Sequence, residues 1–151
     1  MPSATVQQQM PVTSTEVFAL LHDYSRRLGW DSLLKEARLT QGHQQACAGA
    51  TSLCVGKPWF GLIGIETRYV TFKLGDIAAV EMINRPPFFD QFAASIRHQD
   101  NANGSLVVYK FKFVARPWCL RWTLHPLMLI QLRRETQKRL LALAAFLDHK
   151  K

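Results

Sequence analysis

The sequence is poor in cysteine and has no long apolar run. Its three cysteines, Cys47, Cys54 and Cys119, are odd in number, and no pair has the Cys-x-x-Cys spacing of redox or metal sites. Residues 1–10 are polar and hold three glutamines, so we expect no secretory signal and predict reduced thiols in a cytoplasmic protein. A Cys47–Cys54 disulfide is the alternative. No stretch of 18 apolar residues is present, which argues against integral membrane association.

Motifs that mark several catalytic classes are also missing. The five histidines lack the His-x-x-x-His and His-Glu-x-x-His spacings of zinc sites. No Gly-rich phosphate loop follows a predicted strand, and no Gly-x-Ser-x-Gly nucleophile elbow is present. We therefore expect no metal and no cofactor, and neither nucleotide-dependent chemistry nor serine hydrolysis. The histidines are His22, His43, His98, His125 and His149.

The chain has 151 residues, of which 48% are hydrophobic, and a net charge of +8. This length predicts one domain, residues 1–151, with a core that needs neither a disulfide nor a metal. The charge excess is confined to residues 105–151, which hold ten basic and two acidic side chains. Such asymmetry is typical of contact with nucleic acid or an anionic surface, or of the solvated face of a helix. We favour the solvated face, so nucleic acid is not an expected partner.

Three helices are predicted from start signals and apolar spacing. The capping box Thr13–Glu16 and the apolar residues after it predict a helix ending near Asp23. A second short turn, residues 25–28, stops at Gly29. A third helix of about 25 residues starts near Pro126 and carries one apolar stripe. The stripe consists of Leu129, Leu132, Thr136, Leu140, Leu143 and Leu147.

Runs with strand character precede the first helix and fill the chain between the short helices and the last one. Their connections are hairpin-sized, so the sheet is predicted to be antiparallel. The apolar stripe of the last helix must pack against another element, and the apolar face of the sheet must also be buried. The two surfaces are therefore expected to pack against each other. We therefore predict an α+β fold in which a seven-stranded curved antiparallel sheet wraps around a long C-terminal helix. The runs are residues 4–10, 33–41, 51–56, 64–74, 77–84, 89–99 and 106–116.

Two predicted hairpin turns fix which side chains face the helix, because register decides the face. A turn at Asn103-Gly104 places His98 opposite Tyr109. A turn at Gly75-Asp76 puts Tyr69 and Thr71 on the same inner face. The reverse assignment, in which Glu66, Arg68 and Glu81 point inward, stays open. An apolar surface with a few hydroxyl and imidazole groups results, which fits a small-molecule pocket and an ordinary core equally well.

The order of elements and one local motif resemble the START-like, helix-grip (SRPBCC) proteins, the polyketide cyclase/dehydrase and lipid-transport superfamily. The motif is the run Val17-Phe18-Ala19-Leu20-Leu21-His22-Asp23-Tyr24, followed by Trp30-Asp31 and the start of a strand. The positions that carry over are Asp23, Trp30 and Asp31. The architecture matches over nearly the whole chain, and the motif itself has low specificity. The resemblance implies a cavity between sheet and helix for a lipid, sterol, polyketide or other apolar molecule, and it implies no shared catalytic set.

The inner face and the helix stripe predict the lining of such a cavity. Arg133 lies beside the stripe, where it could reach a ligand carboxylate, whereas Arg134, Lys138 and Arg139 are predicted to face water. The predicted ligand-binding residues are Thr67, Tyr69, Val80, Met82, Phe92, Ile96, His98, Tyr109, Phe111, Phe113, Leu132, Arg133, Thr136 and Leu140. The predicted entrance consists of Trp30, Trp59, Phe60 and Trp118.

Three functions are open at this point. The favoured one is binding, transport or sensing of a small hydrophobic ligand, without catalysis. The second is a cyclase or dehydratase that uses His98, Tyr109 or Asp90 for proton transfer in the same cavity. The third is a protein- or RNA-interaction module that uses the basic C-terminal third. No catalytic residue is assigned, and the sequence does not indicate an oligomeric state.

Overall fold

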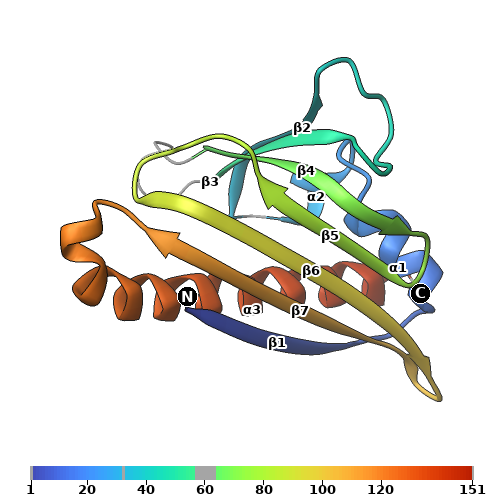
Figure 1. Cartoon of the computed structure of the whole chain (residues 1–151). Coiled ribbons are helices and arrows are strands. Elements are labelled where there is room, and N and C mark those ends of the chain that lie inside the picture. Colours follow the sequence, from blue (N-terminus) through green and yellow to red (C-terminus); the bar gives the residue numbers. More distant parts are fainter. Residues whose placement is uncertain (1, 32, 57–63, 151) are drawn as a thin grey trace.

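The computed structural model describes residues 2–31, 33–56 and 64–150, and within them one curved antiparallel sheet of seven strands holds a long C-terminal helix (Figure 1). The spatial order of the strands is β1-β7-β6-β5-β4-β3-β2. This α+β architecture confirms the predicted helix-grip fold. The strands are β1 (Ser3–Met10), β2 (Leu34–Thr40), β3 (Thr51–Gly56), β4 (Gly64–Lys73), β5 (Ile77–Met82), β6 (Phe89–Asn101) and β7 (Gly104–Ala115).

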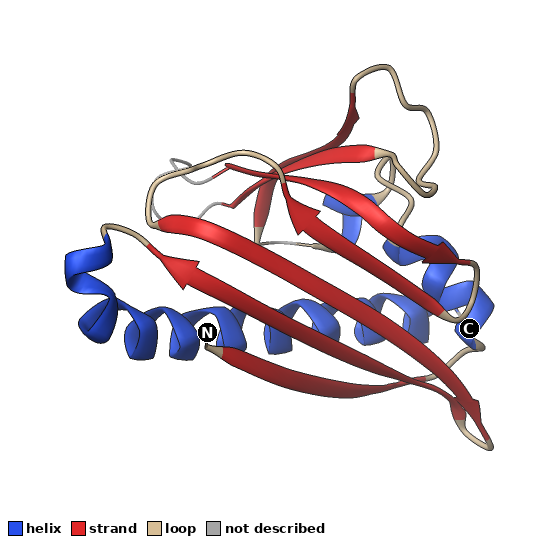
Figure 2. Ribbon diagram, viewed as in Figure 1, coloured by secondary structure: helices blue, strands red, loops and turns tan. Residues whose placement is uncertain are grey.

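The helices cover one side of this sheet (Figure 2). They are α1 (Ser14–Leu21), α2 (Arg27–Trp30), the 3-10 turn η2 (Trp118–Leu120) and α3 (Arg121–Lys150). Thr13 caps α1 as predicted, because its Oγ1 accepts a hydrogen bond from the Glu16 backbone N–H at 3.4 Å. The second helix begins later than predicted and includes Gly29, since its last residue, Trp30, is anchored in the core.

The last helix starts at Arg121, five residues before the predicted start near Pro126, and Pro126 lies inside it. Two side chains of the added turn hold it against the end of β7. Arg121 Nε donates to the Ala115 carbonyl at 2.7 Å, and His125 Nε2 accepts from the Ala115 N–H at 3.0 Å. These contacts offset the backbone hydrogen bond that proline removes from the first turns.

The apolar stripe of α3 divides into two parts. Leu140, Leu143 and Leu147 are buried in one cluster with side chains of β1, α1 and β7. Leu129 and Leu132 pack instead against a second cluster built around the phenylalanines of β6 and β7. Each fully buried leucine contributes roughly 1.5–3 kcal/mol, so the stripe accounts for the docking of α3.

The hairpin between β6 and β7 is shifted by two residues from the predicted register. Asn101 pairs with Gly104, so the turn residues are Ala102 and Asn103, and His98 lies opposite Val107 rather than Tyr109. Gly104 is required for close approach: a Cβ there would lie 2.2 Å from the Met10 carbonyl oxygen of β1. A shift of two keeps every side chain on its predicted face, but the predicted His98–Tyr109 pair is wrong.

A bulge changes the inner face of β4. The pairing with β5 shifts between Tyr69 and Thr71, and Val70 points outward with 51% exposure. Phe72 therefore joins Tyr69 in the core, while Thr71 lies opposite Ala79 on the other face. The sequence carries no signal for this extra residue.

Candidate functional site

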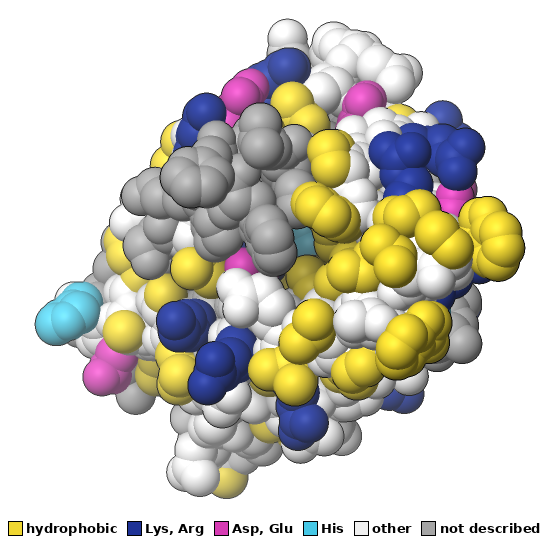
Figure 3. Space-filling view, turned by 90° about the vertical axis from the view of Figure 1, so that its left-hand side faces the viewer, with side chains coloured by type: hydrophobic (Ala, Val, Ile, Leu, Met, Phe, Trp, Pro, Cys, Tyr) yellow, Lys and Arg dark blue, Asp and Glu magenta, His cyan; other side chains and the backbone are white. Residues whose placement is uncertain are grey.

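A cavity of about 350 Å³ lies between the concave face of the sheet and the part of α3 that precedes Leu140. Figure 3 looks onto the end of the molecule where the surface is hollowed. Most of the wall is apolar and comes from the central strands and from α3. The apolar lining includes Leu34, Ile65, Val80, Phe89, Phe92, Ile96, Phe111, Met128 and Leu132.

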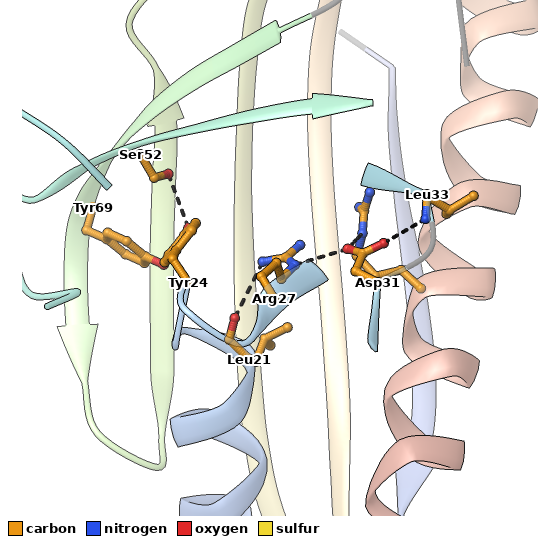
Figure 4. A network of polar contacts seen from close by, with 8 residues as sticks. Leu21, Tyr24, Arg27, Asp31, Leu33, Ser52 and Tyr69 are labelled. Atoms are coloured by element: carbon orange, nitrogen blue, oxygen red, sulfur yellow. Dashed lines mark hydrogen bonds and ion pairs between the residues drawn. The ribbon is translucent and has the colours of Figure 1, made fainter. Parts of the chain in front are cut away.

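Polar groups gather at one end of the cavity in a hydrogen-bonded chain that runs from the end of α1 to β3 and β4. His22 Nδ1 lies 2.7 Å from the Tyr69 hydroxyl, which lies 3.0 Å from the Tyr24 hydroxyl. Tyr24 donates to Ser52 Oγ at 3.1 Å, and Ser52 Oγ lies 3.0 Å from Thr67 Oγ1. Figure 4 shows Tyr69, Tyr24 and Ser52 turned toward one another.

The proton positions in this chain follow from its connections. Tyr24 uses its only hydroxyl proton on Ser52, so Tyr69 donates to Tyr24 and His22 donates from Nδ1 to Tyr69. His22 Nε2 is then a bare acceptor, and it has no hydrogen-bond partner among the described residues.

Burial shifts these groups away from titration near neutral pH. The pKa of His22 is lowered to about 3, chiefly by desolvation and in smaller part by the nearby Arg27 and His98. Burial raises the pKa of Tyr69 well above its usual value and also raises that of Tyr24. The chain therefore offers neutral hydrogen-bond partners rather than a ready acid or base.

Two arginines and one aspartate form the charged part of the polar end (Figure 4). Asp31 is 1% exposed, and its Oδ2 accepts from Arg27 Nε at 3.0 Å and from Arg139 Nε at 2.7 Å. Its Oδ1 accepts from the Leu33 backbone N–H at 3.2 Å. Burial would raise the pKa of this carboxyl, but Arg139 and Arg27 hold it below the usual value. One carboxylate thus anchors two guanidinium groups that both line the cavity.

Some donor groups at this end of the cavity have no partner among the residues that the structure describes. Arg139 makes its one hydrogen bond to the described residues through Nε, which leaves its terminal nitrogens for other partners. The Tyr109 hydroxyl, on a residue that lines the same cavity, has no hydrogen bond to the described residues either. Glu135, one helical turn before Arg139, also lines the cavity and accepts from Gln131 Nε2 at 3.0 Å. The cavity therefore pairs an apolar body with a polar end rich in donors.

Nine of the predicted ligand-binding residues line this cavity, and their contact with a ligand stays a prediction. Those nine are Thr67, Tyr69, Val80, Phe92, Ile96, Tyr109, Phe111, Leu132 and Thr136. Phe113 and Leu140 lie instead in the solid core with no exposure, and Met82 packs against the cluster that contains Phe113. Arg133 is exposed on the outer face of α3, so it is not placed to meet a ligand.

The three acid–base candidates are not brought together. His98 is buried against Phe18, with ring centroids 5.2 Å apart, and it is not among the residues that line the cavity. Both of its ring nitrogens lack a partner among the described residues. Asp90 sits in a bulge of β6 and pairs with Arg85 and Arg121, also away from the cavity lining. Only Tyr109 keeps its predicted place.

The predicted entrance is changed as well. Trp30 is a core residue, 5% exposed, with the Arg27 guanidinium 5.0 Å from its ring, because its neighbour Asp31 is fixed by two arginines. Trp118 is 76% exposed on η2 and does not line the cavity. Trp59 and Phe60 lie outside the described residues.

Reasoning from the sequence missed His22, Tyr24, Arg27 and Arg139 as lining residues. The sequence does contain a pattern that could have identified Arg139. It lies three residues after Thr136, a predicted lining residue, and so shares a helical face with it. The other three lie between the C-cap of α1 and the first residue of α2, and the motif at residues 17–24, which includes His22 and Tyr24, did not indicate that they line a cavity. Cys54, a free thiol, also lines the cavity.

The described residues contain no cluster of three or more His, Cys, Asp or Glu side chains that could hold a metal ion. None of their helices combines the length and apolarity needed to cross a membrane.

No model of a known protein family and no curated protein matches this sequence, but solved structures do. The protein TTHA0849 from Thermus thermophilus superposes with a TM-score of 0.83 at 11% identity, over 99% of each chain. The ZhuI aromatase/cyclase from Streptomyces sp. R1128 gives 0.80 at 10% identity, over 99% of this chain and 94% of that one. The di-domain ARO/CYC StfQ, from the steffimycin biosynthetic pathway, gives 0.81 at 9% identity, over 98% of this chain and 51% of that one.

At these identities the similarity shows the fold. It confirms the helix-grip architecture to which the motif at residues 17–24 pointed, over essentially the whole chain. The matched structures include proteins named as aromatase/cyclases.

Proposed function

We propose that this protein binds a small, largely apolar molecule in the cavity, with an oxygen-bearing end of the ligand directed toward Arg139 and Tyr109. The observation that carries the proposal is the cavity of about 350 Å³ with apolar walls and unused donors at one end. Its volume and lining resemble those of small-molecule sites in general.

Affinity would come from the walls and orientation from the polar end. Each Å² of apolar ligand surface removed from water contributes about 25 cal/mol, so a ligand of two or three fused rings gains most of its affinity from Phe92, Phe111 and Leu132. A ligand carboxylate, phenol or carbonyl would accept from the Arg139 guanidinium in place of water. Glu135, nearer the start of the helix, would repel an acidic group and so favour one orientation.

The protonation states favour binding over proton transfer. A general acid or base works best with a pKa near the working pH. The pKa of His22, lowered to about 3, and that of Tyr69, raised well above its usual value, both lie far from neutrality. These groups would position a ligand oxygen without exchanging protons with it.

Native mass spectrometry of the purified protein and uptake of a fluorescent apolar dye test the proposal. The variant Leu132→Trp fills the cavity from α3, and we expect at least a ten-fold loss of dye affinity. Leu141→Trp makes the same substitution on the outer face of that helix, where Leu141 is 50% exposed, and it should leave uptake unchanged. Equal dye affinity in both variants would contradict binding in this cavity.

A second candidate is a cyclase-type enzyme, favoured by one observation. His22 and Tyr69 both line the cavity, and His22 Nδ1 lies 2.7 Å from the Tyr69 hydroxyl. The fold is shared with ZhuI and StfQ, which are named as aromatase/cyclases. Tyr69→Phe removes the hydroxyl while keeping the ring. If the chain catalyses a cyclisation through this pair, Tyr69→Phe would lose turnover of a linear polyketone while retaining dye uptake.

A further inference from the structure

The end of the molecule beside the cavity exposes an unusual number of large apolar side chains. Trp118 is 76% exposed, Trp122 80%, Leu127 62%, Ile130 57% and Leu120 48%. We call these five residues the end patch. Figure 3 shows hydrophobic side chains gathered on this end of the molecule, next to the hollow. Soluble proteins seldom expose such a set unless it contacts something.

The end patch is built from one continuous segment. η2 presents Trp118 and Leu120, and the first turns of α3 present Trp122, Leu127 and Ile130. The inner side of the same segment packs against the core through Met128 and Leu129. The segment is therefore docked on the sheet without a contribution from the exposed side chains of the end patch. Exposed tryptophan pairs on a helix that does not span the bilayer are typical of proteins lying in a membrane interface.

The charges around the end patch are mostly positive. Arg133 and Arg134 follow Ile130 by three and four residues and are exposed, so they extend its outer face. Arg116 and Arg121 flank η2. Two acidic side chains lie nearby, Asp90, which pairs with Arg121 and Arg85, and Glu135, which accepts from Gln131, so the arginines outnumber the acidic groups. An apolar centre with an excess of arginine complements anionic phospholipid headgroups.

We propose that the end patch docks this protein on the surface of a bilayer that contains anionic lipid. Leu127 belongs to the patch and also lines the cavity, so the docked cavity faces the bilayer. An apolar ligand can then pass between membrane and cavity without crossing water. The docking itself does not depend on which ligand the cavity takes, so it goes beyond the function proposed above.

Vesicle flotation tests this, with phosphatidylcholine alone or mixed with phosphatidylglycerol. We expect binding to the mixed vesicles and at least a ten-fold weaker binding by Trp118→Ala/Trp122→Ala, because both tryptophans insert. Arg133→Gln/Arg134→Gln should lose roughly five-fold per charge, and added salt should have the same effect. Leu74→Ala is the control, since Leu74 is 68% exposed in the turn between β4 and β5, at the opposite end of the sheet from η2 (Figure 1).

Dye uptake and circular dichroism accompany each variant. The tryptophan variant should take up dye as the wild type does, which separates failed docking from a failed cavity. Failure of the wild type to bind mixed vesicles, or equal loss in Leu74→Ala, would overturn the proposal. So would a concentration-dependent dimer that Trp118→Ala/Trp122→Ala abolishes, because the end patch would then be covered by a second copy of the chain.

Discussion

Acid should destabilise this protein at a pH where most proteins of its size are stable, and His98 and His22 are the cause. Both imidazoles are buried and neutral. Burial lowers the pKa of His98 to about 4, although Asp76 opposes the shift, and burial lowers that of His22 to about 3. The unfolded chain takes up protons near pH 6.5, so between pH 6.5 and 4 it binds more protons than the folded chain. The free energy of unfolding therefore falls as the pH falls through this window.

The size of the effect follows from the two pKa values. With a folded pKa of about 4 and an unfolded pKa of 6.5, His98 alone removes about 2 kcal/mol between pH 8 and pH 5. His22 removes about 2 kcal/mol more over the same interval. A chain of this length loses roughly 2–4 °C of melting temperature per kcal/mol, so the midpoint should drop by about 10 °C.

Urea denaturation at pH 8 and pH 5 measures the two contributions, and His98→Leu separates them. His98 lies opposite Val107 and against Phe18, and neither ring nitrogen has a partner among the described residues. Leucine fits such surroundings, so the variant should be as stable as the wild type at pH 8 and lose about half as much at pH 5. His22→Leu is the contrast, because it removes the partner of Tyr69 and should cost about 1–3 kcal/mol already at pH 8.

Two outcomes would refute this reasoning. One is an identical acid-induced loss in the wild type and in His98→Leu, because the histidine would then not titrate on unfolding. The other is a loss well above 1 kcal/mol for His98→Leu at pH 8, which would mean that the ring makes a hydrogen bond essential to the fold.

Three further substitutions test other parts of the structure. Leu140→Arg buries an unpaired charge in the core beneath α3 and should prevent cooperative thermal unfolding, whereas Leu140→Ala should cost about 2–5 kcal/mol in urea. Gly104→Ala places a methyl group 2.2 Å from a carbonyl oxygen of β1 and should lower the melting temperature sharply, while Gly29→Ala, with open space around it, should raise it slightly. Asp31→Asn leaves two guanidinium groups sharing no carboxylate and should cost about 3–5 kcal/mol in urea, and a neutral result would show that the pair is solvated.

The elements of the fold were predictable because each rests on a repeated signal. Runs of strand-forming residues between turn signals located all seven described strands to within a few residues, and the stripe through Leu140 and Leu143 located α3. The errors fall where a single residue decides the backbone. The bulge at Val70 reverses the face of Thr71, and the two-residue turn before Gly104 shifts His98 away from Tyr109. Such choices are set by contacts with distant strands, here between Gly104 and Met10.

The site was only half predictable, and the division has a physical reason. Wall residues such as Phe92 and Phe111 alternate along strands, so the period reveals them. Which side chains of α3 belong to the polar end depends on the rotation of the helix about its axis. In the structure this rotation places Arg139 in the cavity lining and leaves Arg133 exposed on the outer face. The leucine stripe shows which side of α3 faces the sheet, but it does not decide which of the residues next to the stripe enters the cavity. The salt bridge from Arg139 to Asp31, a residue 108 positions away, fixes the rotation in the structure.

The two parts of α3 imply that stability and function are separable on this helix. Leu140, Leu143 and Leu147 fill a solid core with β1 and α1, so substitutions there should change the free energy of unfolding and disturb the cavity only through unfolding. The part before Leu140 covers a cavity and exposes its outer face, so Leu132→Trp should alter uptake with a small stability change. A chain under selection for stability alone would close this space and replace the exposed tryptophans, because both features forgo apolar burial. Both features lie near the start of α3, with Trp118 on η2 and Trp122 on α3, and this favours the joint role in handling an apolar ligand that we propose.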